Sequence, residues 1–148
     1  MDRMPVVRVR RQDPSLPLPR YESPGAAGMD LRARLPETLT VPPLGRVMIP
    51  TGLMLEIPAG YEAQVRPRSG LAAASGLTVL NSPGTIDSDY RGELKVILVN
   101  LGSGPCSIEN GDRIAQLVFS PVVQAALEDA ERLDGTERGG GGFGSTGR

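Results

Sequence analysis

Histidine is absent from this sequence of 148 residues. The absence excludes a Ser-His-Asp triad, a Cys-His pair, a His-liganded zinc or iron ion, and the histidine-containing signature of the zinc deaminases. Any hydrolysis by this chain must therefore use carboxylates, arginines and a metal ion with oxygen ligands.

The chain also has a single cysteine, and it lacks a charge imbalance and long apolar runs. Cys106 is the only cysteine, so the chain can form neither an internal disulfide nor a Cys-rich metal site, which fits a reducing compartment. The 16 basic and 17 acidic residues leave a net charge of −1, which gives no overall field to attract nucleic acid or an anionic membrane. No apolar run approaches the roughly 18 residues of a membrane span, and residues 1–14 lack the apolar core of a secretory signal. We expect a cytoplasmic protein that has neither nucleic acid nor a membrane as a partner.

Glycine and proline are abundant, with 19 and 14 residues. They divide the chain into Val-, Ile- and Leu-rich segments that are too short for stable helices, and the close spacing of turns favours antiparallel strands. For this length the sequence predicts one domain, an all-β barrel or sandwich. The expected strands are Val6–Arg10, Met29–Ala33, Leu39–Val41, Arg46–Ile49, Gly52–Ile57, Tyr61–Val65, Leu77–Leu80, Glu93–Leu101, Cys106–Ile108 and Arg113–Val123.

Two segments have helical character. The alanine run within Ser69–Ser75 predicts one short turn of helix. Gln124–Leu133 has good helix propensity but few apolar positions, and because tertiary context overrides propensity its state stays open.

The composition changes at Asp134, where the sequence becomes DGTERGGGGFGSTGR. This segment has almost nothing to bury and is expected to be mobile when free. We therefore divide the chain into a β-domain of residues 1–133 and a flexible Gly-rich tail of residues 134–148. A frayed terminus is one interpretation of the tail. The other is a lid, because glycine N–H groups and Arg138 can bind phosphates and Phe143 can stack on a base.

The segment LNSPGTIDSDYRGEL at residues 80–94 predicts a hairpin. Its turn-forming residues occupy positions 83–92, and the alternation of leucine and valine after them is typical of a half-buried strand. Taken alone, Asp87 and Asp89 would be ordinary turn carboxylates.

Five segments distributed along the chain resemble, in order and spacing, the five motifs of the trimeric dUTPase family. The resemblance covers nearly all of Pro24–Arg148, and NSPGTIDSDYRGE in the third segment is close to diagnostic. The segments are AGMDLRA at 27–33, RPRSGLA at 66–72, the hairpin sequence above, GDRIAQLVF at 111–119 and RGGGGFGSTGR at 138–148.

The resemblance implies a distorted jelly-roll β-barrel with one short helix and a flexible C-terminal tail. It also implies hydrolysis of dUTP to dUMP and pyrophosphate. Attack of water on the α-phosphate needs an activated water, a metal ion that gathers the phosphates, and cations that absorb the developing charge. Asp87 matches the family's aspartate that activates this water, a general-base role that suits a carboxylate.

Magnesium is the cofactor that the resemblance implies. Asp30 matches the first-motif aspartate, which is expected to support Mg²⁺ through its water shell while the substrate phosphates hold the ion. The alternative for Asp30 is a strand-end carboxylate paired with Arg32 or Arg113. Arg66 and Arg113 can likewise be members of structural ion pairs rather than ligands.

The resemblance also assigns the contacts to the nucleoside. Tyr90 matches the tyrosine that packs under the deoxyribose and leaves no room for a 2′-hydroxyl, and Asn81 matches the asparagine that pairs with the uracil edge. The tight fit of the hairpin then excludes the methyl group of thymine. The other hairpin residues expected at the substrate are Gly84, Thr85, Ile86 and Lys95.

Contacts to the phosphates are expected from three further segments. Arg68, Ser69 and Gly70 match the second motif, and Gln116 matches a phosphate-contacting glutamine in the fourth. Many relatives carry a histidine where the tail has serine, which removes one cation or donor here. The tail residues expected to contact the nucleotide are Arg138, Phe143, Gly144, Ser145 and Thr146, with Phe143 stacked over uracil.

Family members build each active site from three chains. Motifs one, two and four line one face, the hairpin comes from a neighbour, and the tail comes from the third chain. We therefore expect a homotrimer with shared active sites that takes dUTP as its substrate, with Gln124–Gly135 as the arm that carries the tail to another subunit.

Two alternatives differ in class. A dCTP deaminase shares this fold. Members of that group have in common an R-S-S segment and a catalytic glutamate, whereas in this chain Arg68-Ser69 is followed by Gly70. A non-catalytic binding module on the same scaffold would have lost the base or the tail motif, yet Asp87 and Phe143 are both present.

Overall fold

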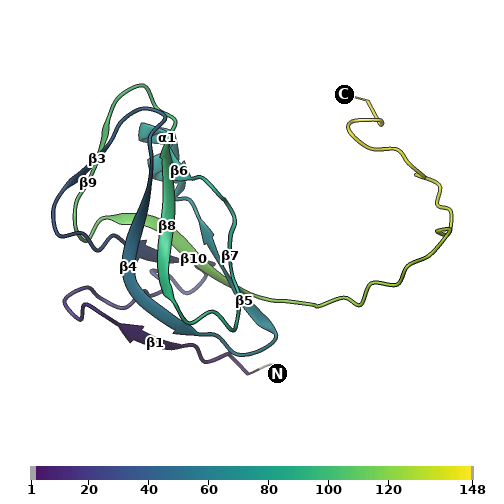
Figure 1. Ribbon diagram of the computed structural model, residues 1–148, viewed down its shortest axis with the longest axis horizontal. Helices are drawn as coiled ribbons and strands as arrows, with labels where there is room; N and C mark the ends of the chain where they lie inside the picture. The colour runs from purple at the N-terminus through teal and green to yellow at the C-terminus, as the bar shows by residue number, and fades with distance from the viewer. Residues whose placement is uncertain (1–2, 148) are drawn as a thin grey trace.

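The computed structural model describes residues 3–147, and in this part of the chain it is almost entirely β-structure (Figure 1). The predicted all-β fold with one short helix is confirmed. Residues 1–2 and 148, at the ends of the two predicted segments, lie outside the described residues. The elements are β1 Arg8–Arg11, β2 Met29–Arg32, β3 Leu39–Val41, β4 Arg46–Glu56, β5 Tyr61–Arg66, α1 Ser69–Ser75, β6 Leu77–Val79, β7 Gly84–Ile86, β8 Glu93–Asn100, β9 Cys106–Ile108 and β10 Arg113–Pro121.

The strands form two four-stranded sheets and one two-stranded pair. The first sheet has the order β1-β4-β8-β6, the second has the order β2-β10-β5-β7, and β3 pairs with β9. Every pairing is antiparallel, as the short connections predict. The two sheets do not join into a closed barrel.

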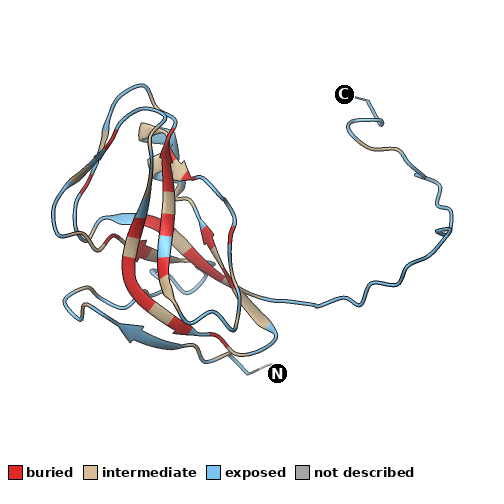
Figure 2. Cartoon of the chain, viewed as in Figure 1, coloured by how far each residue is buried: buried red, intermediate tan, exposed pale blue. Residues whose placement is uncertain are grey.

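The core lies between the two sheets and follows the two-residue period of the strands. In β8, Leu94, Val96 and Leu98 are buried at 0–1% exposure, while Lys95 between them is exposed. Leu31 of β2 and Leu117 of β10 come from the other sheet and belong to the same buried cluster. Figure 2 shows these buried stretches along the strands that face one another. Alternate residues of these strands, such as Lys95, therefore lie on an outer face.

The main difference from the predicted strands is β4. Arg46–Ile49 and Gly52–Ile57 were expected as separate strands, but they form one strand of 11 residues. The register with β8 shifts between Pro50 and Met54, which marks a β-bulge, and Gly52 has a φ of 72°. Glycine adopts this left-handed backbone conformation without steric cost, so Pro50 and Gly52 bend the strand and do not end it.

The short helix is confirmed at its predicted bounds, Ser69–Ser75. Alanine favours it, and it ends where Gly76, with a φ of 73°, donates its N–H to the carbonyl of Ala72. No helix within residues 3–147 is long and apolar enough to cross a membrane.

The chain leaves the body after β10. The N–H of Val122 donates to the carbonyl of Gly60 at 2.9 Å, and every residue from 122 to 140 is exposed. Gln124–Leu133, whose state the sequence leaves open, is not a helix and forms an extended arm (Figure 1). Leu127 and Leu133 on this arm are 96% and 89% exposed, so the arm carries apolar side chains with nothing in its own chain to cover them.

Candidate functional site

The β7–β8 hairpin presents Asp87 at the surface. Its turn is closed by the N–H of Tyr90, which donates to the carbonyl of Asp87 at 3.2 Å. The Arg91 guanidinium donates to the carbonyl of Ser88 at 2.6 Å and stiffens the same turn. The Asp87 side chain is exposed, and within residues 3–147 it has neither a hydrogen bond nor an ion pair. A free carboxylate held in an ordered turn is available to a water molecule.

Asp87 lies at a cleft of about 450 Å³ where the two sheets meet. The cleft forms here because β7 belongs to one sheet and β8 to the other, so the hairpin bridges them. Five of the predicted substrate and catalytic residues come together in it. The lining residues are Met48, Thr85, Ile86, Asp87, Tyr90, Glu93, Leu94 and Lys95.

Met48, Glu93 and Leu94 line this cleft although the sequence did not assign them to the site. Glu93 and Leu94 lie within the hairpin motif, which was the available signal. Met48 belongs to β4 and is opposite Ile97 of β8, so only the strand pairing reveals it.

Of the two remaining hairpin residues of the predicted site, Gly84 begins β7 and Asn81 lies three residues before it. Gly84 is opposite Val65 of β5, and a Cβ atom on Gly84 would lie 3.3 Å from the Nδ2 atom of Asn81. The Asn81 amide therefore lies directly over the Gly84 backbone. Glycine at this position lets the asparagine side chain approach the strand.

A second group of predicted residues lies on the outer face of the sheet β2-β10-β5-β7. Gln116 of β10 is opposite Asp30 of β2 and opposite Arg66 of β5, which places the three side chains in one row across the sheet. The Gln116 amide donates to the carbonyl of Pro67 at 3.0 Å. This bond holds the segment that leads from β5 to the phosphate-contacting residues predicted at Arg68.

Asp30 is the centre of an arginine–carboxylate cluster. The Arg68 Nε atom lies 3.1 Å from one carboxylate oxygen, and the Arg113 guanidinium lies 3.5 Å from the other. The suggested pairing with Arg113 is therefore present, while the suggested pairing with Arg32 is wrong, because Arg32 instead donates to the carbonyl of Gly111 at 2.9 Å. Arg68 was not expected as the main partner.

The residues Ser69 and Gly70 begin α1 and are both exposed. The first intrahelical bond runs from the N–H of Ala72 to the carbonyl of Arg68, so the N–H groups before it have no partner inside the helix. These donors lie next in sequence to the Arg68 guanidinium. An anionic ligand is a suitable partner for these N–H groups and for the Arg68 guanidinium.

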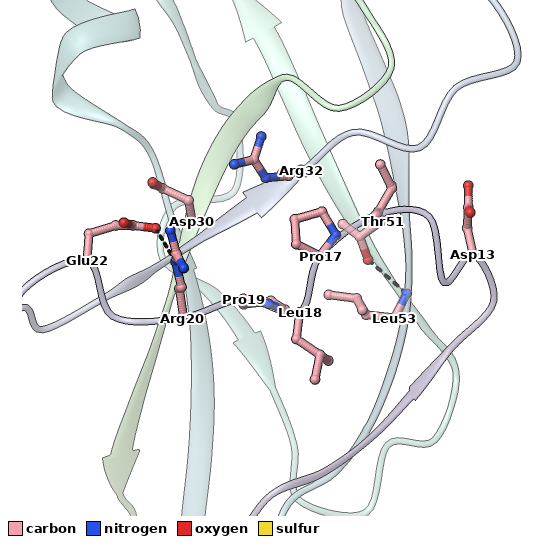
Figure 3. A pocket seen from close by; sticks show the side chains of 11 residues that line it. Asp13, Pro17, Leu18, Pro19, Arg20, Glu22, Asp30, Arg32, Thr51 and Leu53 are labelled. Atoms are coloured by element: carbon pink, nitrogen blue, oxygen red, sulfur yellow. Dashed lines mark hydrogen bonds and ion pairs between the residues drawn. The ribbon is translucent and has the colours of Figure 1, made fainter.

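A smaller pocket of about 260 Å³ lies beside Asp30, between β2, β4 and the N-terminal segment (Figure 3). Arg20 and Glu22 form an ion pair there at 3.3 Å. At its other end, the hydroxyl and then the N–H of Ser15 lower the pKa of Asp13 from its usual value, with a further contribution from Arg34. The pocket contains both signs of charge and shares only Asp30 with the predicted site.

The hairpin and the Asp30 cluster do not converge within one chain. β2 and β7 are the two edge strands of their sheet, with β10 and β5 between them. Three strand spacings separate these edges by roughly 14 Å. Within one chain, Asp30 and the hairpin strand β7 therefore lie at opposite edges of the sheet.

The predicted tail residues lie away from both groups. The tail forms only local turns, in which Arg138 donates its Nε hydrogen to the carbonyl of Gly141 at 2.7 Å. Phe143 is fully exposed, with a φ of 52°. Figure 1 shows the tail at the end of the extended arm, far from the sheets.

These features define a class of protein. Exposed arginines, a turn carboxylate at a cleft and a glycine-rich tail on a two-sheet β-fold suit a phosphate-bearing ligand.

Comparisons with known proteins identify the family within this class. The chain belongs to the dUTPase family, because the family model described as dUTPase matches residues 15–147. A protein of Mesorhizobium japonicum is 63% identical over 134 residues, covering 89% of this chain and 83% of its own length. A protein of Anaeromyxobacter sp. (strain Fw109-5) is 61% identical over 149 residues, covering 98% of this chain and all of its own. Both are named deoxyuridine 5'-triphosphate nucleotidohydrolase.

Solved structures show the same fold. A dUTPase of Staphylococcus bacteriophage 80alpha with bound dUpNHpp superposes with a TM-score of 0.87 at 26% identity, covering 97% of this chain and 99% of its own. A dUTPase of phage phi11 of S. aureus, solved to show a structural Mg(II) ion, superposes with a TM-score of 0.77 at 24% identity, covering 86% and 97%. The predicted family and the predicted dUTPase-type jelly roll are confirmed.

Proposed function

We propose that this chain hydrolyses dUTP to dUMP and pyrophosphate. Membership of the dUTPase family and relatives of more than 60% identity with the corresponding enzyme name support this activity. The observation that carries the assignment in this chain is the hairpin cleft, where the free Asp87 carboxylate and the Tyr90 ring line one cavity.

Asp87 acts as the general base. Its carboxylate orients a water molecule and removes its proton as the oxygen attacks the α-phosphorus, and pyrophosphate leaves on the opposite side. No histidine is available for this proton transfer. The exposed position of Asp87 in a turn closed by a backbone hydrogen bond supports the role, because the base is held in place but remains open to water.

The hairpin recognises the nucleoside. The Tyr90 ring packs under the deoxyribose and leaves no space for a 2′-hydroxyl, while the Asn81 amide and the backbone around Gly84 pair with the uracil edge. A site built from such close contacts discriminates by steric exclusion and by leaving polar groups unpaired in the wrong ligand. The remaining hairpin residues in the proposed nucleoside site are Thr85, Ile86 and Lys95.

The phosphates bind to the residues around α1 and β10. Arg68 offers the guanidinium nitrogen that is not engaged with Asp30 or with the carbonyl of Arg113. The first-turn N–H groups of Ser69 and Gly70 have no partner inside the helix, and Gln116 lies in the same row of side chains as Asp30. In the tail, Arg138, Ser145 and Thr146 contact the terminal phosphate. Phe143 stacks over uracil, with Gly144 giving the turn its freedom.

Magnesium fits the donor set of this chain if substrate phosphates and water supply most of its ligands. Within residues 3–147 no group of three or more acidic, cysteine or histidine side chains converges, so the protein alone offers no cage for a metal. Mg²⁺ commonly binds through one carboxylate, several waters and substrate phosphates, and Asp30 is suited to be that carboxylate through water. When bound, the ion gathers the phosphates and neutralises their charge. The arginines that contact Asp30 hold its carboxylate at the phosphate side of the site.

The site is completed by a homotrimer. The hairpin and the Asp30 cluster lie at opposite edges of one sheet, and the arm at Gln124–Gly135 exposes apolar side chains. Exchange of arms between chains covers those side chains and brings each tail to another subunit. A cytoplasmic location belongs to the same proposal.

A panel of nucleotides tests the proposed activity. Purified protein with magnesium should release pyrophosphate from dUTP at least about 100-fold faster, by kcat/KM, than from dTTP, dCTP or UTP, because each rival adds or lacks a group at a tightly fitted contact. Incubation with dCTP should release no ammonia, whereas ammonia would indicate a deaminase. Absence of pyrophosphate from dUTP would contradict the proposal.

A further inference from the structure

The bulge in β4 lies directly opposite the base of the catalytic hairpin. The register with β8 breaks between Pro50 and Met54 and resumes at the pair Met54 and Glu93, the first residue of β8. A bulge leaves backbone groups outside the regular ladder, and such groups need partners when they are buried. Gly52 is buried, so its N–H is a donor of this kind.

Side chains supply the missing partners. The Gly52 N–H donates to the Glu93 carboxylate at 3.2 Å. The Thr51 hydroxyl, 3% exposed, donates to the carbonyl of Leu94 at 2.7 Å and accepts the N–H of Leu53 at 3.3 Å. Residues 93–94 are thus fastened to the bulge by two hydrogen bonds that do not belong to the sheet ladder.

Glu93 also contacts the tyrosine of the cleft, Tyr90. The Tyr90 hydroxyl donates to the backbone carbonyl of Glu93 at 2.9 Å. The ring lies over Gly92 so closely that a Cβ atom there would clash with the hydroxyl oxygen, so glycine at this position leaves room for the tyrosine. Tyr90 and Glu93 both line the cleft that contains Asp87.

We propose that Glu93 is a positioning residue that sets the choice between deoxyribose and ribose. Its carboxylate fixes the start of β8 to the bulge at Gly52, and its carbonyl, held in place by that bond, fixes the Tyr90 ring that forms the floor under the sugar. Glu93 acts through Tyr90 and does not touch the reacting atoms. The inference rests on the proposed function, because it assigns Tyr90 to the sugar.

Three variants test the inference. Glu93→Ala removes the acceptor of the Gly52 N–H, and Glu93→Gln keeps an oxygen acceptor at the same reach. Glu56→Ala is the control, which removes a carboxylate and its exposed ion pair with Arg8 from the neighbouring strand. For Glu93→Ala we expect KM for dUTP to rise about tenfold with kcat within about threefold of wild type, because a ground-state contact shared by the transition state is loosened. The ratio of kcat/KM for dUTP over UTP should fall about tenfold or more. Glu93→Gln should restore both values to within about threefold of wild type, and Glu56→Ala should leave them unchanged.

Three outcomes overturn the inference. An unchanged dUTP-to-UTP ratio in Glu93→Ala would show that the residue does not set the sugar choice. A Glu93→Gln protein as impaired as Glu93→Ala would show that acceptance of the Gly52 hydrogen bond is not the cause. A uniform loss of activity on both substrates, in step with a lowered unfolding midpoint, would assign Glu93 to stability alone.

Tyrosine fluorescence tests the same contact without any substrate. The chain has no tryptophan and three tyrosines, so in a Tyr21→Phe, Tyr61→Phe background the emission comes from Tyr90. Acrylamide should quench this emission about twofold more strongly when Glu93→Ala is added, and Glu93→Gln should not change it. Equal quenching in all three proteins would contradict the proposed link, whereas a wild-type protein without dUTP turnover would contradict the proposed function instead.

Discussion

Asp87→Asn is expected to lower kcat for dUTP by about 10³-fold or more while the Kd for a non-hydrolysable dUTP analogue stays within about threefold of wild type. The amide has nearly the shape of the carboxylate but cannot accept the proton of the attacking water. Because the Asp87 side chain has no protein partner within residues 3–147, the substitution breaks no contact that stabilises the hairpin. The measurement is pyrophosphate release under saturating dUTP, together with calorimetric binding of the analogue.

Asp89→Asn provides the control for this variant. Asp89 is exposed in the same turn, so its substitution makes the same change in charge and shape two residues away. We expect it to retain kcat within about threefold. A near-normal kcat in Asp87→Asn, or an equal loss in Asp89→Asn, would show that Asp87 is not the base.

Removal of the tail before Arg138 is expected to lower kcat/KM for dUTP by about 100-fold or more and to leave the fold intact. Arg138 and Phe143 contact nothing in the body of their own chain, so their loss removes no packing from the two sheets. A lid that donates hydrogen bonds to the phosphates and excludes bulk water acts only once substrate is bound. Its loss is therefore expected to lower the rate of turnover and not the stability of the fold. The measurements are steady-state kinetics, the unfolding midpoint and the mass in solution.

Two point variants separate the lid from a general effect of truncation. Arg138→Ala should lower kcat/KM for dUTP about tenfold, which is part of the loss caused by truncation, because one charge-assisted contact to phosphate disappears. Glu137→Ala changes the adjacent exposed residue and should have no effect. Full activity in the truncated protein would make the tail a frayed terminus and not a lid.

Local patterns in the sequence predicted much of the fold. Alternation of apolar and polar residues predicted β8, and the alanine run predicted α1 at its observed bounds. Proline and glycine as signals of a strand end were misleading at Pro50 and Gly52. The strand continues there through a bulge, although composition alone divides it in two. Propensity left Gln124–Leu133 undecided, and the segment is extended and exposed along its whole length.

Long-range pairings limited the prediction of the site. The hairpin residues are adjacent in sequence, so their shared cleft could be anticipated from one motif. The sequence suggested Arg32 or Arg113 as the partner of Asp30, and the ion pair with Arg113 is present. The further contact with Arg68 depends on which segments become neighbours in the fold. Met48 enters the cleft for the same reason, through the pairing of β4 with β8.

Mixing two inactive variants tests most directly the claim that hairpin and tail of one active site belong to different chains. Asp87→Asn chains keep the tail, and chains truncated before Arg138 keep the hairpin. After unfolding and refolding together in equal amounts, random trimers should contain about one quarter of sites with both parts intact, and dUTP hydrolysis should return to about that fraction of wild type. Activity no higher than the average of the two variants alone would contradict a site shared between subunits.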